Sequence, residues 1–410
     1  MTEKCIFAHE TKQRIYLKKM RTIKWAILVC LMGFFSSIQA QAQDSIRFSL
    51  LTCEPGEEIY SLFGHTALRY QNFTEQKDLV FNYGMFSFRT PNFIYRFVKG
   101  ETDYQLGITP YRYFEAEYAL RGSSVYEQEL NLTAEEKKNL LNRLTENYLP
   151  ENRVYRYNYF YDNCTTRARD QIEQSIHGKV VYPGETVPRS FRSIIHEFTS
   201  NAPWDQFGID LCLGAEADKP IDKRLQQFAP FYMRDFASQA YIVNEAGVRR
   251  PLVKQETKII EAEPAAVRPA SPLSPMNAAA LFLALNGLVA WLQWRKKTIF
   301  WGWDLLLYGL QGLAGCIIAF LFFLSVHPTV GSNWMLLLLN PVPLVYLPVM
   351  TYRSIKGQRD RYHLINLVYL TLFIVIFPFS PQEFNLTVLP LALGLLVNAA
   401  SHVLVWNKKA

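Results

Sequence analysis

The chain has 410 residues, 50% of them hydrophobic, and a formal net charge of +7 at pH 7. Part of the basic charge lies in the N-terminal leader and in short loops between apolar runs. The charge therefore gives no support to nucleic-acid binding, and that class is excluded. The two halves differ: residues 44–272 are mixed and polar, whereas the sequence beyond residue 276 is largely apolar.

The N-terminus predicts a signal peptide over residues 1–42. Basic residues at positions 18–24 precede an apolar stretch at 25–35, and Ala40-Gln41-Ala42 provides the small-x-small pattern of a cleavage site. An uncleaved anchor is the alternative. In both cases the domain that follows is exported.

Residues 43–255 predict an exported α+β domain. Alternating apolar residues between turn clusters indicate strands at 45–52, 59–70, 78–88, 105–109 and 123–130. The aromatic segment 91–99 indicates a short helix between the third and fourth of these strands.

Helices are expected in the second part of this domain. Thr133 followed by Glu136 is a capping-box pattern and begins a helix that Pro150 stops near residue 148. Another helix is expected over 165–176, with Gly178 as its C-terminal signal. Residues 179–250 mix short helices and loops in no predictable order, and the proline-rich segment 256–275 is expected to be a linker.

The C-terminal part predicts a membrane domain over residues 276–410. Apolar runs long enough to cross a bilayer lie at 276–294, 299–325, 333–351, 364–379 and 385–406. Two polar residues within these runs, Asp304 and His402, lie near helix ends and are interpreted as reaching the membrane interface rather than as functional groups.

Loop charges predict the orientation of the membrane domain. Lys and Arg gather in the loops 295–297 and 353–361 and in the tail 408–409, whereas the loops 327–332 and 380–385 contain neither. Because basic loops remain in the cytoplasm, the exported domain is expected in the periplasm. The expected location is the bacterial inner membrane, with the C-terminus in the cytoplasm.

The exported domain contains three cysteines. Cys5 and Cys30 belong to the leader and Cys316 to the second span, which leaves Cys53, Cys164 and Cys212. An odd number in an oxidising compartment permits a Cys53–Cys212 disulfide that spares Cys164, or three free thiols. Both remain open.

Cys164 is the candidate nucleophile. It opens the expected helix after Asp162 and Asn163, where the helix dipole and unpaired amides stabilise a thiolate and can bind an oxyanion. Asn163 and Asp162 are expected to cap the helix and shape the turn. A buried structural cysteine, or half of a disulfide, is the alternative.

His65 is the candidate general base, because its imidazole titrates near neutral pH and it follows Gly64 in an expected strand. A polar strand residue without a catalytic role is the alternative. The other histidines of the domain, His177 and His196, have no comparable setting.

Asn82 is the candidate for the third group, which orients the imidazole through its side-chain oxygen. The alternative is that residues 82–84 form only a bulge or turn. Asp78 and Tyr161 are weaker candidates for the same role.

Other kinds of site receive no support. The sequence contains no HExxH, no HxxxH and no paired CxxC motif, so no metal ligand is assigned. Neither GxSxG nor a glycine-rich phosphate loop is present, and no cofactor is expected.

Three motifs in order resemble the Lnb family of bacterial lipoprotein N-acyltransferases. They are Phe63-Gly64-His65-Thr66-Ala67-Leu68-Arg69, Phe81-Asn82-Tyr83-Gly84 and Asp162-Asn163-Cys164-Thr165-Thr166-Arg167. The resemblance spans roughly residues 45–235, and the trailing membrane helices match the family layout. It implies a circularly permuted NlpC/P60 (papain-like) fold, in which the strand with histidine precedes the helix with cysteine.

The resemblance also implies an activity. Cys164, deprotonated by His65, would take an acyl chain from a membrane phospholipid and pass it to the N-terminal amine of a diacylglyceryl-lipoprotein. The aromatic residues of 86–97 and 155–161 are candidates for an acyl groove, with core packing as the alternative. Two other functions stay open: an NlpC/P60-like peptidoglycan peptidase or amidase, and a non-catalytic membrane scaffold.

Overall fold

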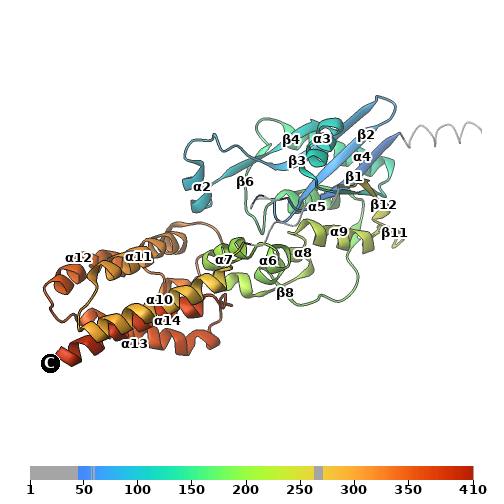
Figure 1. Cartoon of the computed structure of the whole chain (residues 1–410). Coiled ribbons are helices and arrows are strands. Elements are labelled where there is room, and N and C mark those ends of the chain that lie inside the picture. The colour runs from blue at the N-terminus through green and yellow to red at the C-terminus, as the bar shows by residue number, and fades with distance from the viewer. Residues whose placement is uncertain (1–44, 57, 59–60, 263–270, 410) are drawn as a thin grey trace, which may run out of the picture.

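The computed structural model describes residues 45–56, 58, 61–262 and 271–409. The expected signal peptide 1–42, with Cys5 and Cys30, lies outside the described residues. Figure 1 shows a sheet-containing domain followed by a bundle of long helices. The predicted α+β class, with a mixed domain before five membrane helices, is confirmed.

A seven-stranded sheet forms the centre of the N-terminal domain. Its strand order is β12-β5-β1-β2-β3-β4-β6, and every neighbouring pair is antiparallel. The strands are β1 (Ile46–Cys53), β2 (His65–Asn72), β3 (Lys77–Met85), β4 (Asp103–Pro110), β5 (Val125–Leu130), β6 (Val154–Arg156) and β12 (Val253–Ile260). Because β12 pairs with β5, the first residues of the expected linker 256–275 belong to the sheet.

Helices cover both faces of this sheet. On one face α4 (Ala134–Tyr148), α5 (Cys164–Ser175) and α9 (Pro230–Gln239) pack against side chains such as Phe48 and Leu68. On the other face α3 (Tyr111–Arg121) packs against Leu51 and Val80. The expected capping box of α4 forms: Thr133 and Glu136 exchange side-chain and backbone hydrogen bonds.

Helix α3, like the strands β6 and β12, was not expected from the sequence. It buries Phe114 and Tyr118 and exposes most of its other residues, so its buried face consists of one pair of residues four positions apart. Such a stripe gives no recognisable helical periodicity. The short helix expected at 91–99 is α2 (Phe93–Lys99).

Shorter elements lie between α5 and β12 in the chain. The helices are α6 (Phe191–Thr199), α7 (Pro203–Cys212), η1 (Ala215–Asp218) and α8 (Lys223–Gln226). The strands are β7 (Lys179–Val181), β8 (Arg189–Ser190), β9 (Pro220–Ile221), β10 (Tyr241–Val243) and β11 (Arg249–Pro251). A second apolar cluster, which includes Phe63, Phe160, Phe191 and Phe228, lies among these helices.

The membrane domain has five candidate spans by length and composition, as predicted. They are Pro275–Lys296, Trp301–Leu324, Trp334–Ile355, Arg361–Phe379 and Val388–Asn407. The corresponding helices are α10 (Pro275–Lys296), α11 (Trp301–Leu324), η2 (Trp334–Leu337) with α12 (Val342–Ile355), α13 (Arg361–Ile376) with η3 (Phe377–Phe379), and α14 (Val388–Lys409). The third span is interrupted before Pro341, because proline cannot continue the helix hydrogen bonds.

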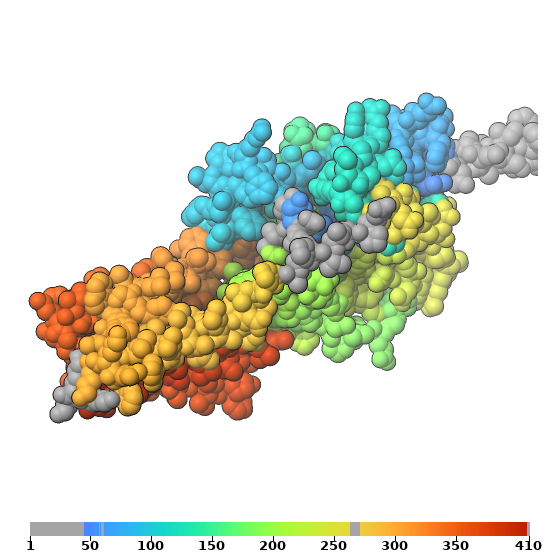
Figure 2. All heavy atoms as spheres, viewed as in Figure 1, coloured from blue at the N-terminus to red at the C-terminus, as the bar shows by residue number. Residues whose placement is uncertain are grey.

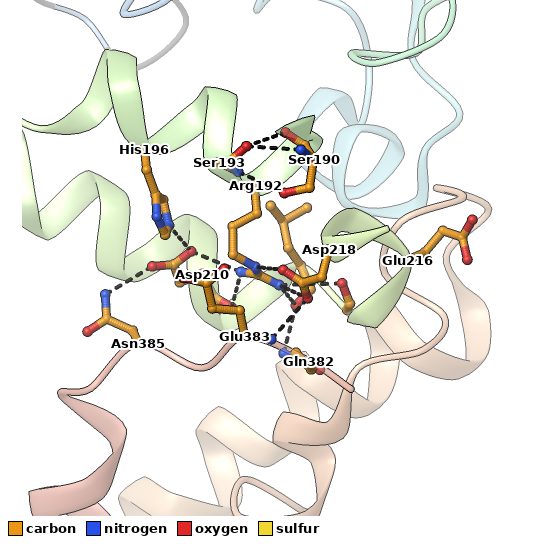
Figure 3. A network of polar contacts seen from close by, with 12 residues as sticks. Ser190, Arg192, Ser193, His196, Asp210, Glu216, Asp218, Gln382, Glu383 and Asn385 are labelled. Atoms are coloured by element: carbon orange, nitrogen blue, oxygen red, sulfur yellow. Dashed lines mark hydrogen bonds and ion pairs between the residues drawn. The ribbon is translucent and has the colours of Figure 1, made fainter. Parts of the chain in front are cut away.

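A buried ionic network joins the two domains. Arg192 is fully buried, with Nη1 2.9 Å from Asp210 Oδ1 and Nε 2.6 Å from Asp218 Oδ1. From the membrane domain, Asn385 donates to Asp210 Oδ2 at 2.9 Å and the Glu383 amide donates to Asp218 Oδ2 at 3.1 Å (Figure 3). The carboxylates that Arg192 neutralises therefore also accept the hydrogen bonds that fasten the membrane domain.

Replacing Arg192 by leucine is expected to lower the free energy of unfolding by about 3–5 kcal/mol, because two buried carboxylates lose their cation. Arg189→Leu is the matched control, since its ion pair with Glu197 is about 40% exposed. Thermal unfolding of the full-length protein in micelles measures both. Equal midpoints for the two variants would contradict a structural role for this network.

Candidate active site

Gly64 sets the position of His65. Its φ is +78°, and a Cβ at this position would lie 2.4 Å from the carbonyl oxygen of Cys53. Only glycine fits there without strain. The expected strand 59–70 therefore begins later, at His65, which pairs in register with Cys53 of β1.

A Gly64→Ala variant is expected to be destabilised by about 1–3 kcal/mol, because alanine is strained at this φ and contacts the Cys53 carbonyl. Displacement of His65 should also lower any Cys164-dependent rate by about 100-fold. Gly122→Ala is the control: its φ is also positive, at +64°, but nothing lies within 4 Å of an added Cβ. Unfolding midpoints that fall equally would show that the close contact at Gly64 has no effect.

Cys164 is the first residue of α5, as predicted. Asn163 caps the helix, and its side-chain oxygen accepts from the amides of Thr165 and Thr166, both at 2.9 Å. Asp162 binds Arg167 through two bonds of 2.6 and 2.8 Å. The hydrogen bonds of Asn163 and Asp162 thus fix the turn that presents the Cys164 sulfur.

The first backbone amides of α5 differ in whether they have a hydrogen-bond acceptor. Thr165, Thr166 and Arg167 all donate to Asn163, the last to its carbonyl at 3.1 Å. Among the described residues, the amide of Cys164 has no such acceptor. It is therefore the group of the first turn that is available to a developing oxyanion.

A buried contact holds the histidine strand against the cysteine helix. The hydroxyls of Thr66 and Thr165, each next to a candidate catalytic residue, are 3.0 Å apart and shielded from solvent. His65 and Cys164, both half-buried, line one cavity and influence each other's charge. The structure thus brings together two residues that are 99 positions apart in the sequence.

The electrostatics of this pair favour a thiolate and an imidazolium. Burial disfavours both charges, but the adjacent His65, together with the Thr66 amide, outweighs it and lowers the pKa of Cys164. Burial likewise opposes a charged His65, yet the neighbouring Cys164 and Asn82 raise its pKa. An ion pair of this kind is the reactive form of a nucleophilic cysteine.

The structure places Asn82, the candidate orienting group, beside His65. Its Oδ1 lies 3.2 Å from Nε2 of His65. The pairing of β3 with β4 also shifts between Asn82 and Met85, so the bulge expected as an alternative is present as well. Of the weaker candidates, Asp78 instead binds Arg69, at 2.6 Å, and Tyr161 is absent from the cavity described next.

A cavity of about 370 Å³ opens at these three residues. Nine of its 25 lining residues are aromatic, and only Phe86, Tyr157 and Tyr159 among these nine were suggested by the sequence. The other aromatic lining residues are Phe63, Tyr83, Tyr104, Phe114, Tyr118 and Phe228. Polar groups, including Glu54, Glu117 and Arg121, also reach it.

Most residues of this wall were not predictable from the sequence. Phe114 and Tyr118 lie on the missed helix α3, and Phe228 lies in the segment whose order was not predictable. Conversely, Phe93, Tyr155 and Phe160 from the proposed groove are buried core residues, as the packing alternative had it. Aromatic composition alone does not distinguish residues that line a cavity from residues that pack in the core.

The four cysteines within the described residues are free thiols. The Cys53–Cys212 disulfide is therefore not formed. Burial raises the pKa of Cys53 and of Cys212, which keeps both in the unreactive thiol form. Cys164 is the cysteine whose pKa is lowered.

Family models match two parts of the chain. Residues 35–195 match the Lnb N-terminal periplasmic domain, and residues 268–410 match the Lnb transmembrane domain. Together the matches cover about three quarters of the sequence. No curated protein and no solved structure matches significantly, so the permuted papain-like topology stays a prediction. The two domain matches, in the order seen in the structure, show that the chain belongs to the Lnb family of membrane-bound, lipoprotein-modifying enzymes.

Proposed function

We propose that this protein transfers an acyl chain from a membrane phospholipid to the N-terminal amine of a diacylglyceryl-lipoprotein through a thioester on Cys164. The observation that carries the proposal is the placement of Cys164, His65 and Asn82 in the wall of one cavity, with Asn82 Oδ1 3.2 Å from Nε2 of His65. The chemistry is that of a cysteine nucleophile with a base and an orienting amide.

In the first half-reaction, the Cys164 thiolate attacks the carbonyl carbon of an acyl ester. The amide of Cys164 donates to the oxyanion of the tetrahedral intermediate. The ester C–O bond then breaks, and imidazolium His65 gives its proton to the departing alkoxide. The products are a thioester and a lysophospholipid with a free hydroxyl.

In the second half-reaction, the lipoprotein amine attacks the thioester carbon. Neutral His65 accepts a proton from the attacking nitrogen, the C–S bond breaks, and the thiolate returns. Asn82 keeps Nε2 of the imidazole occupied through both steps, so Nδ1 is the nitrogen left to give and accept the proton. A thioester suits this route because it reacts readily with amines.

The position of the site supports a lipid as acyl donor. Helix α2 contacts the end of α11: the Val326 amide donates to the Lys99 carbonyl at 2.8 Å, and the Tyr95 and Phe320 rings are 5.9 Å apart. Figure 2 shows this segment, in light blue, beside the end of the orange bundle. With the basic loops in the cytoplasm, this end of the bundle lies at the periplasmic surface of the inner membrane.

Around α2, apolar side chains are exposed next to the cavity. Phe88 is 66% and Ile94 is 76% exposed, and Met85 and Phe86 continue from them into the cavity wall. Exposed apolar side chains at the surface of the membrane favour contact with the acyl chains of lipids. We infer that a phospholipid reaches Cys164 along this segment.

An Ile94→Asp or Phe88→Asp variant is therefore expected to lower transfer from phospholipid vesicles by about tenfold or more, because a carboxylate is disfavoured in an apolar lipid layer. Transfer from a short-chain soluble ester should stay within about twofold. Val248→Asp, an exposed apolar position in the turn before β11, is the control. An equal loss with both donors would contradict a lipid-contact role.

The reaction class is tested with purified full-length protein in two assays. One supplies phospholipid vesicles and a synthetic diacylglyceryl lipopeptide, and the other supplies peptidoglycan fragments. The proposal expects an N-acylated lipopeptide and a lysophospholipid in the first assay. Cleaved peptide bonds in the second assay, with no transfer in the first, would favour the peptidoglycan peptidase instead.

A further inference from the structure

A cluster of ionisable side chains lies within the membrane domain, away from the cysteine site. Asp304 of α11, His363 of α13 and His402 of α14 each bring one ligand atom within 4.8 Å of the others. All three are buried. The expectation that Asp304 and His402 reach the membrane interface is therefore wrong, because neighbouring helices enclose them.

The partners of these residues do not account for all their polar atoms. Asp304 Oδ1 accepts from Asn398 at 3.2 Å and lies 3.1 Å from Nε2 of His402. Within the described residues, both ring nitrogens of His363 and Nδ1 of His402 have no hydrogen-bond partner. Unpaired polar groups are costly inside a bilayer, where no water compensates them.

We propose that Asp304, His363 and His402 bind a divalent transition-metal ion such as Zn²⁺. Two imidazoles and one carboxylate are a common ligand set for such ions, with water or another group completing the shell. The cation would occupy the unpaired nitrogen lone pairs and balance the buried carboxylate.

The surrounding residues fit a metal site. Asn398 donates to Asp304 Oδ1 and itself accepts from the Tyr308 hydroxyl at 3.0 Å. These two hydrogen bonds fix the orientation of the Asp304 carboxylate. The two imidazoles are stacked, with centroids 3.5 Å apart and planes 12° apart. Because a metal lies in the plane of each ligand ring, coordination by both rings requires them to tilt apart from this stack.

The site would connect three helices at the membrane end opposite α2. Asp304 lies in the first turn of α11 and His363 in the first turn of α13, next to the basic loops expected in the cytoplasm. This placement gives the ion a role in fastening the bundle. The proposal does not depend on acyl transfer at Cys164.

The test is the zinc content of full-length protein, purified in micelles with a tag that contains no histidine. The protein is dialysed first against ZnCl₂ and then against zinc-free buffer, and bound metal is measured by mass spectrometry. We expect about one ion per chain, at least about tenfold less in His363→Ala and His402→Ala, and no change in His177→Ala. His177 is an exposed histidine of the periplasmic domain.

A second measurement on the unmodified protein does not depend on how the variants fold. Added Zn²⁺ should raise its midpoint of thermal unfolding by several degrees, because a ligand that binds the folded state stabilises it. The proposal is overturned if the unmodified protein retains no zinc and gains no stability. It is equally overturned if the His363→Ala/His402→Ala double variant retains as much zinc as the His177→Ala control.

Discussion

Cells that carry Cys164→Ala as their only source of this protein, and no other N-acyltransferase, are expected to accumulate lipoproteins with a free N-terminal amine. The thiolate is the attacking group, so its removal should lower the transfer rate by about 10⁴-fold or more. Mass spectrometry of intact lipoprotein N-termini measures the missing acyl chain.

Cys212→Ala is the matched control for this experiment. Cys212 is also a free, partly buried thiol, but burial raises its pKa and it does not line the cavity. Cells that carry Cys212→Ala should N-acylate their lipoproteins normally. Normal N-acylation in the Cys164→Ala cells would contradict the proposed role of Cys164 and would favour a scaffold.

A His65→Gln variant is expected to lower the transfer rate by about 10²–10⁴-fold, because the base and the proton donor are lost together. It should also change the thiol itself. Burial opposes the Cys164 thiolate and His65 is the main group that overcomes it, so the pKa of Cys164 should rise in the variant. At pH 7, alkylation by iodoacetamide should slow about tenfold for each unit of that rise.

The pH dependence of alkylation tests the sign of this coupling. In the unmodified protein, the alkylation rate should rise as pH rises through the lowered pKa of Cys164, and it should change a second time where His65, whose pKa is raised, loses its proton. Asn82→Ala should move this second change to lower pH, because the bond to Asn82 helps to raise the pKa of His65. An alkylation profile in His65→Gln that coincides with that of the unmodified protein would show that the two side chains are not coupled.

The sequence was sufficient to predict the parts of the site that depend on local pattern. Asn163 and Cys164 are recognisable as a helix start, and Gly64 marks the residue before His65. The α4 capping box and the membrane spans follow from equally local rules. The start of β2 was misplaced because the carbonyl of Cys53, which excludes a side chain at Gly64, comes from another strand.

Features that depend on packing between distant segments were not predictable. The aromatic wall combines residues from β3, β4, α3 and the loop after α8, and no single stretch contains its pattern. The network around Arg192 includes hydrogen bonds between residues 165 and 175 positions apart. The cluster at Asp304 likewise needs His363 and His402 from two other helices. Asp304 and His402 look like interface residues in the sequence because helix ends usually reach water.

The most direct test of the account is the mass of the full-length protein after incubation with phospholipid vesicles and no lipoprotein acceptor. The account predicts a mass increase of one acyl chain, located on the peptide that contains Cys164 and released by hydroxylamine, as a thioester requires. It also predicts that the adduct disappears when a diacylglyceryl lipopeptide is added. An acyl chain on another residue, or transfer to the lipopeptide without any adduct on Cys164, would contradict it.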